Sequence, residues 1–245
     1  MKRYLSGFAI LWLASVALWA GCRADNGELA LVAGGSFMAG STALLTKDNP
    51  ERPAQVAAFH IMRHEVTVAR YTDCVAAGAC AAIHLAGPFG RDDLPMTHVT
   101  WDEAQSYCRW RGMRLPTENE WERAARGRGN TLYPWGDEFA PEAANGGHAK
   151  ACRKKDTVFR FAAPGGCFPK DRSDFGVMDM AGNVAEWTAE VYSPEPGRGG
   201  DAAVKVVKGG YFYAEPNQLS GAWREASHQY VRSPRIGFRC VKDVD

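Results

Sequence analysis

Two segments near the start of the chain carry apolar residues in the pattern of β-strands. Residues 32–40 (VAGGSFMAG) alternate small and apolar side chains, and residues 56–65 place Phe59 and Ile61 two positions apart. Alternation with a period of two is typical of a strand with one buried face. The polar, proline-containing stretch 42–53 between them predicts a loop. We therefore expect two early strands.

Three later segments combine apolar residues at helical spacing with helix-start signals. Two of them open with a capping box, in which a threonine and a glutamate three residues later satisfy each other's backbone N–H groups. A glycine or the loss of periodicity ends each helix. The expected N-caps and extents are Thr67 with residues 68–77, Thr100 with residues 101–111, and Thr117 with residues 118–126.

Three glutamates at the start of the third predicted helix, Glu118, Glu120 and Glu122, could form a carboxylate cluster. Acidic residues are favoured in a first helical turn because they complement the helix dipole, which accounts for Glu118 and Glu120. For Glu122 we expect a solvated side chain. The pattern predicts structural rather than catalytic roles.

The second half of the chain shows no sustained helical period beyond Gly127. The whole chain has 26 glycines and 13 prolines, about a sixth of its 245 residues, which favours a loop-rich α+β domain over a helical bundle. A hydrophobic content of 46% is enough for one sizeable core. Loop-rich halves of this kind stay ordered through disulfides or bound cations.

The N-terminus has the features of an export signal. Lys2 and Arg3 precede the apolar stretch 4–20, and small residues lead to Cys22 in the manner of a bacterial lipoprotein cleavage box. Trp19 departs from the leucine usual there, so plain secretion remains the alternative. We expect a signal peptide at residues 1–21, a lipidated Cys22, a tether at 22–31 and one domain at 32–245. The predicted location is the periplasm, with anchoring to the outer membrane by lipid alone.

Charge and cysteine content agree with export. Without Lys2 and Arg3 the chain has 27 basic and 28 acidic residues, so its electrostatics give no case for nucleic acid. Six cysteines remain besides Cys22, and in an oxidising compartment an even set predicts three disulfides among 15 pairings. Free buried thiols are the alternative. The pairs that could bridge locally are Cys74 with Cys80 and Cys152 with Cys167.

An ordered set of motifs then narrows the family. They are FGVMDMAGNVAEWT (175–188), VTWDEA (99–104), RLPTENEWE (114–122), YPWGD (133–137), KGG (208–210) and GFRC (237–240). The set resembles the formylglycine-generating enzyme family, also called the sulfatase-modifying-factor family, from about Ala33 to Val241. The resemblance implies a C-type-lectin-like α+β fold that is loop-rich, with few short helices and short strands. It also implies a disulfide between Cys108 and Cys240.

Two structural calcium sites follow from the same resemblance. The first takes Asn145, the carbonyl of Gly146 and, one residue out of register, Asp156. The second takes Asn183, the carbonyl of Val184 and Glu186. Carboxamide, carbonyl and carboxylate oxygens are the ligands that calcium prefers. The alternative for the second set is a polar turn ahead of the core residue Trp187.

The two cysteines that the resemblance implies for oxidase activity are absent from this sequence. The resemblance assigns copper(I) binding and oxidation of a substrate cysteine by O₂ to two cysteines in the segment after KGG. Ala214 and Leu219 stand at those positions, and neither side chain can bind copper. Catalytic residues and copper are therefore not expected.

Aromatic and basic residues after KGG predict a surface for a peptide or a carboxylate. The candidates are Tyr211, Tyr213, Trp223, Arg224, His228 and Arg235. The alternative places the aromatic residues in the core and the arginines in solvent, and Arg239 is interpreted as the partner of a buried acid. We expect a calcium-stabilised binding or accessory module with a protein or peptide partner in the cell envelope. The competing hypothesis is a divergent metal-dependent oxidase acting on a protein or a small molecule.

Overall fold

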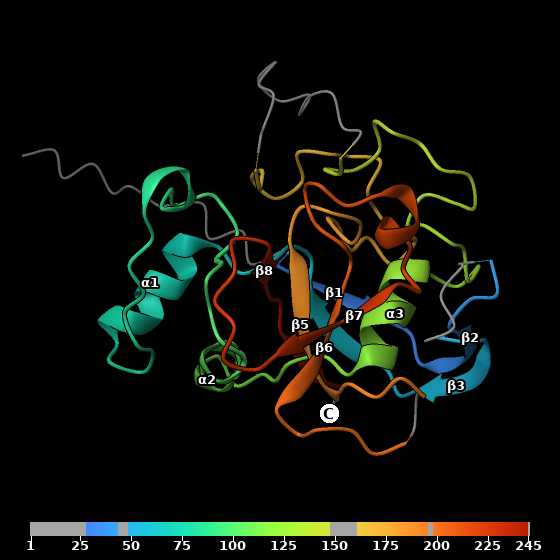
Figure 1. The fold of residues 1–245 in the computed structure, drawn as a ribbon, viewed down its shortest axis with the longest axis horizontal. Coiled ribbons are helices and arrows are strands. Elements are labelled where there is room, and N and C mark those ends of the chain that lie inside the picture. The colour runs from blue at the N-terminus through green and yellow to red at the C-terminus, as the bar shows by residue number, and fades with distance from the viewer. Residues whose placement is uncertain (1–27, 44–48, 148–160, 196–197, 245) are drawn as a thin grey trace, which may run out of the picture.

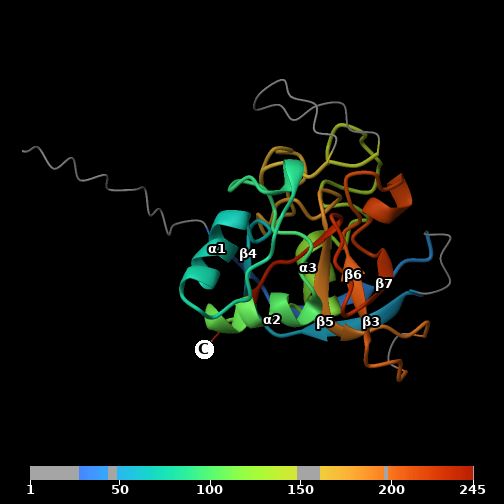
Figure 2. The same cartoon turned by 60° about the vertical axis from the view of Figure 1, so that its left-hand side comes forward.

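The computed structural model describes residues 28–43, 49–147, 161–195 and 198–244. The predicted signal peptide, Cys22 and most of the tether lie outside these residues, as do Cys152 and Asp156. Short helices and small sheets carry long ordered loops, so the expected loop-rich α+β architecture is confirmed. The long loops formed by residues 127–147 and 161–182 gather at one end of the molecule (Figures 1 and 2).

Three small sheets form the frame of the described part. Their strand orders are β1-β4-β9, β2-β3 and β7-β6-β5-β8, and every pairing is antiparallel except β5 with β8. The strands are β1 (Leu29–Val32), β2 (Gly35–Ala39), β3 (Arg52–Val56), β4 (Phe59–Met62), β5 (Ala185–Val191), β6 (Val204–Lys208), β7 (Arg224–His228), β8 (Ile236–Gly237) and β9 (Val241–Asp243).

The two expected early strands are in fact four. The predicted tether ends sooner than residue 31, because Leu29 begins β1, and the segment 32–40 divides between β1 and β2. The division falls at Gly34, where a Cβ atom would lie 2.7 Å from the backbone nitrogen of Ala58. Only glycine permits that close approach of two backbones. The segment 56–65 divides in the same way between β3 and β4.

The three predicted helices are confirmed as α1 (Val68–Ala76), α2 (Trp101–Trp110) and α3 (Glu118–Arg126). Both capping boxes are complete in the structure. The 3₁₀ turns η1 (Gly87–Phe89) and η2 (Pro216–Leu219) are added. None of the described helices has the length and apolar character needed to cross a membrane.

Helix α3 is the central packing element. It lies between the β2–β3 pair and strands β5 and β6 (Figure 1). Trp121, Ala124 and Ala125 are fully buried in its core-facing side, as their spacing predicts. This position places the polar residues of α3 against both sheets.

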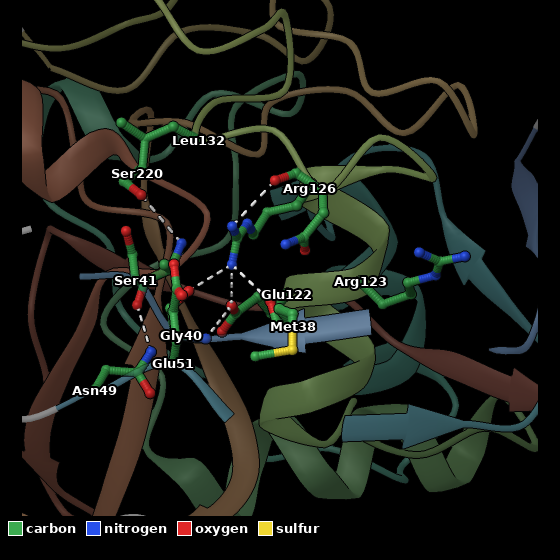
Figure 3. Close-up of polar contacts among 12 residues, drawn as sticks. Met38, Gly40, Ser41, Asn49, Glu51, Glu122, Arg123, Arg126, Leu132 and Ser220 are labelled. Carbon is green, nitrogen blue, oxygen red and sulfur yellow. Dashed lines mark hydrogen bonds and ion pairs between the residues drawn. The ribbon is translucent and has the colours of Figure 1, made fainter. Parts of the chain in front are cut away.

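The interior face of α3 also carries a buried ion network, which corrects the expectation of a solvated Glu122. This glutamate is 0% exposed. It accepts hydrogen bonds from the Gly40 backbone N–H at 2.7 Å and from Arg126 Nη1 at 2.8 Å (Figure 3). It also accepts from Lys208 Nζ at 3.1 Å. Two cations and the N–H group at the end of β2 thus surround one carboxylate. Glu122 is buried because both sheets pack on α3, so more of the helix is covered than its apolar residues alone predict.

Arg126 extends this network to the backbone. Besides Glu122, its guanidinium donates to the carbonyl oxygens of Met38 and Gly40 (Figure 3). It also donates to those of Asn130 and Thr131. A guanidinium has five donors in a fixed geometry, so one side chain can hold several chain segments. Arg126 thereby joins the end of β2 to the loop that follows α3.

Two disulfides are confirmed, Cys74–Cys80 and Cys108–Cys240. The second joins α2 to the segment before β9 across 132 residues. Closing a loop of that length restricts the unfolded chain and is worth on the order of 4–5 kcal/mol by loop-closure entropy. Cys167 is also disulfide-bonded.

Candidate functional site

The positions where the family's oxidases carry cysteines are apolar and closed in this chain. Ala214 is 0% and Leu219 2% exposed, and both belong to a small cluster with Tyr133, Ala144 and Ala181. Neither side chain offers a lone pair to a metal or a proton to a base. The cluster is therefore a packed interior and contributes no reactive group.

A cleft of about 270 Å³ lies beside this cluster, over the face of the β7-β6-β5-β8 sheet. Arg235 Nη1 donates to the Tyr211 hydroxyl at 2.9 Å, and the guanidinium carbon lies 4.6 Å from the centre of the Tyr211 ring. Glu225, Ser227 and His228 of β7 and Ser233 add further polar groups to its lining. We call this the Tyr211–Arg235 cleft.

The structure brings three of the six predicted surface residues to that cleft: Tyr211, His228 and Arg235. Tyr213 is 56% exposed, packs edge-to-face against the Phe212 ring and does not line the cleft. The remaining two, Trp223 and Arg224, do not line it either.

Arg224 is a correction to the predicted surface. It is buried, its Nε lies 2.9 Å from Glu118 Oε1, and its Nη1 donates to the Ser193 carbonyl at 2.7 Å. Its ring contact is with Tyr192, at 4.7 Å from the guanidinium carbon to the ring centre. This arginine therefore neutralises a buried glutamate of α3.

The predicted turn before Trp187 is present and places Asn183 in the interior. Gly182 and Asn183 have φ values of 81° and 56°, the left-handed region that these two residue types favour. The Asn183 Oδ1 accepts from the Ala163 backbone N–H at 2.7 Å and from Asn145 Nδ2 at 3.0 Å. Asn145 and Asn183 thus meet side chain to side chain, with Gly146 and Val184 beside them in the chain.

Glu186 is placed differently from the calcium prediction. Its two oxygens accept from Arg239 Nη2 and Nε, each at 2.7 Å, and Oε2 also accepts from the Trp121 indole at 2.7 Å. Both Glu186 and Arg239 are 0% exposed. The carboxylate forms a bidentate ion pair with Arg239 and makes no contact with Asn183, so calcium at Glu186 stays a prediction. The interpretation of Arg239 as the partner of a buried acid is confirmed.

The carboxylate beside Asn183 is that of Glu65, which the sequence reasoning missed. Asn183 Nδ2 donates to Glu65 Oε1 at 2.9 Å, while the buried Glu65 Oε2 has no hydrogen-bond partner in the described part of the chain. Burial raises the pKa of Glu65 well above its usual value, and the nearby Asp179 raises it further. No clear signal existed in the sequence, because Glu65 directly follows Arg63 and His64 in a segment that is half polar.

Two further carboxylates, those of Asp171 and Asp179, belong to the acidic interior around Asn183 and Glu65. Burial, and then the charge of Asp179, also raise the pKa of Asp171 well above its usual value. Asp179 itself lies 2.7 Å from His64 Nδ1. Within the described residues there is no group of three or more His, Cys, Asp or Glu side chains that could hold a metal. Amide and carbonyl oxygens would have to complete any cation site here, and Asn183 with Glu65 fits that donor chemistry better than Asn183 with Glu186.

Comparison with known proteins identifies the family. Residues 18–244 match the family described as "Sulfatase-modifying factor enzyme 1-like domain". The chain is 31% identical to the formylglycine-generating enzyme of Mycobacterium tuberculosis, with 88% of this chain and 98% of that protein covered. The chain therefore belongs to the formylglycine-generating enzyme, or sulfatase-modifying-factor, family.

Two further comparisons refine the picture. The mouse protein "Inactive C-alpha-formylglycine-generating enzyme 2" is 45% identical over 62% of this chain, and the match spans only 50% of that relative's length. A bovine relative of the same name is likewise covered over half its length. The solved structure of PvdO from Pseudomonas aeruginosa superposes with a TM-score of 0.73 at 24% identity, over 89% of this chain and 95% of that one. That likeness confirms the expected fold.

Proposed function

We propose that this protein is an exported binding or accessory module of the cell envelope that does not generate formylglycine. The observation that carries the proposal is the closed apolar cluster at Ala214 and Leu219. Copper(I) requires soft thiolate ligands, and these two positions supply carbon only. In this proposal the chain keeps the fold of the family, and the Tyr211–Arg235 cleft binds a ligand without the copper-dependent oxidation.

The Tyr211–Arg235 cleft is the recognition surface in this proposal. Arg235 is exposed and presents a planar set of donors that suits a carboxylate. The Tyr211 ring holds the guanidinium in place and offers a flat apolar contact. The ligand class is a peptide or protein segment with a free or side-chain carboxylate.

Calcium and a lipid anchor complete the proposal. Asn183 and Glu65 would contribute calcium ligands, together with carbonyls of the same loops, and the ion would stabilise the loop-rich half. The unpartnered Glu65 Oε2 supports this donor set. Lipidation of Cys22 would hold the protein at the outer membrane, and the oxidising periplasm suits its disulfides.

A peptide experiment tests the proposal. The purified protein is incubated with peptides from an envelope extract, and the captured peptides are sequenced by mass spectrometry. We expect Arg235→Gln to abolish capture, as amidation of the peptide carboxylates should, while the matched exposed-residue control Arg91→Gln keeps it. Capture that survives both amidation and Arg235→Gln would remove the cleft from the proposal. Conversion of a Cys-x-Pro-x-Arg peptide to its aldehyde would instead establish the oxidase alternative.

A further inference from the structure

A second cleft of about 540 Å³ lies at the other end of strand β5. The Tyr211–Arg235 cleft touches Ala185 at the start of β5, whereas this one is lined by its last residues, Ala189 to Val191. The other walls are formed by residues of β3, α3 and β7 and by described residues that follow β5: Arg52, Glu118, Asn119, Arg224, Ser193, Arg198 and Gly199. The two clefts share no lining residue. We call this second one the Arg52–Glu190 cleft.

One wall of the Arg52–Glu190 cleft carries an unpaired acid. The half-buried Glu190 carboxylate has no hydrogen-bond or ion-pair partner among the described residues. Burial raises its pKa, and the charges of Glu118 and Glu120 of α3 raise it further. Arg224 and Lys205, on β7 and β6, act in the opposite direction without contacting it. The site at Glu190 therefore favours a positively charged group.

Another wall carries a cation without a counter-charge. Arg52 Nη1 donates to Asn49 Oδ1 at 2.6 Å and its Nη2 donates to Asn119 Oδ1 at 3.2 Å, both neutral amides. In the described part of the chain no carboxylate lies within ion-pair distance of it. The two amides fix the guanidinium in place but leave its charge uncompensated.

The other charges of the cleft are already paired. Arg224 lies 2.9 Å from Glu118, and Arg198 lies 2.7 Å from Glu195. This leaves one spare positive and one spare negative group in the same cavity, Arg52 and Glu190, which do not contact each other. A ligand with a single charge would leave one of them desolvated and unpaired, which costs free energy.

We propose that the Arg52–Glu190 cleft binds a zwitterionic ligand whose ammonium group pairs with Glu190 and whose carboxylate pairs with Arg52. The chemical class is an amino acid or a short peptide with one group of each charge. Ala189 and Val191 supply apolar surface for the connecting carbon chain. The volume lies in the range of sites that enclose small ligands.

The ω-amino acids from 4-aminobutanoate to 8-aminooctanoate test the proposal on the purified protein. Hexanoate and hexylamine are the single-charge controls, and isothermal titration calorimetry measures affinity. We expect one chain length to bind at least ten-fold more tightly than either control, and Glu190→Gln to remove that advantage. Affinity should fall as the pH is lowered through the Glu190 pKa. Glu225→Gln, which changes an acid that lines the Tyr211–Arg235 cleft, should have no effect.

Three results overturn this inference. One is the absence of binding by every ω-amino acid of the series, and another is equal binding of hexanoate. The third is loss of binding on Glu225→Gln but not on Glu190→Gln, which would move the ligand to the other cleft. Glu190 makes no side-chain bond among the described residues and its charge is disfavoured by burial and by Glu118 and Glu120, so Glu190→Gln should leave the unfolding midpoint unchanged or raise it. An altered fold therefore does not account for a loss of affinity.

Discussion

Glu122→Gln is a sharp test of the buried network on α3, because it removes one charge and hardly changes the volume. In the native protein this carboxylate faces Arg126 at 2.8 Å and Lys208 at 3.1 Å. All three side chains are at most 5% exposed. The amide would leave two buried cations around a neutral group.

The cost follows from that burial. Removing one partner of a buried ion pair is worth about 3–5 kcal/mol, because an uncompensated charge stays in the interior. Glu118 lies 3.9 Å from Lys208 Nζ and compensates it in part, which points to the lower half of that range. For a chain of this length each kcal/mol corresponds to roughly 2–4 °C in unfolding midpoint. We therefore expect a decrease of about 6–15 °C.

Thermal unfolding followed by circular dichroism, with disulfides intact, measures this decrease. The matched control is Glu142→Gln, which breaks the Lys170–Glu142 pair at 2.7 Å, where both side chains are 57% exposed. Surface pairs are worth about 0–1 kcal/mol, so the control should shift the midpoint by no more than a few degrees. Equal midpoints for the two variants would refute the argument that burial of Glu122 decides its contribution.

The remaining predictions concern the acid-rich interior around Asn183. Excess chelator should lower the unfolding midpoint of the purified protein, and Glu65→Gln should reduce that effect; an unchanged melt in chelator would count against calcium at either site. A second prediction follows from the raised pKa of Glu65. The folded state binds this proton more tightly than the unfolded state, so the associated stability is complete below the ordinary pKa of 4.5 and is lost as the pH rises through the folded pKa. In chelator, stability should therefore decline above pH 4.5, and Glu65→Gln should flatten that decline in urea unfolding curves; an identical pH slope in both proteins would contradict it. Asp171 contributes in the same direction and remains in the variant.

Local signals made the helices predictable from sequence. Thr100 with Glu103 and Thr117 with Glu120 lie within four residues of each other, so their capping boxes need no tertiary contact to form. The KGG motif was equally informative, because it aligns the segment that follows it and shows Ala214 and Leu219 at the positions of the family's two cysteines. The fold class followed from the motif set as a whole.

Burial of charged residues was not predictable in the same way. Glu122 is interior because Gly40 and Lys208, 82 and 86 residues away in the chain, close over it. The position of Glu122 in the predicted helix did not indicate that its side chain would be buried. Glu186 is a second example. The resemblance assigned Glu186 to a calcium site, and a separate prediction paired Arg239 with a buried acid that the sequence did not identify. The structure shows that these are one carboxylate.

Most of the predicted ligand surface depended on tertiary placement as well. Tyr211 and Arg235 are 24 residues apart and meet only because both border the same sheet. Arg224 and His228 are the first and last residues of β7, but Arg224 is buried because it pairs with Glu118. Side-chain type gave six candidates, of which three line the cleft, and the counter-charge of Glu118 on α3 explains why Arg224 is not among them.

An anaerobic copper(I) titration against a competing chelator tests the central claim most directly. The purified protein should take up no tightly bound copper(I), because Ala214 and Leu219 supply no thiolate. The double variant Ala214→Cys/Leu219→Cys serves as the positive comparison and should gain one site. Tight binding of one equivalent by the unmodified protein would contradict the account.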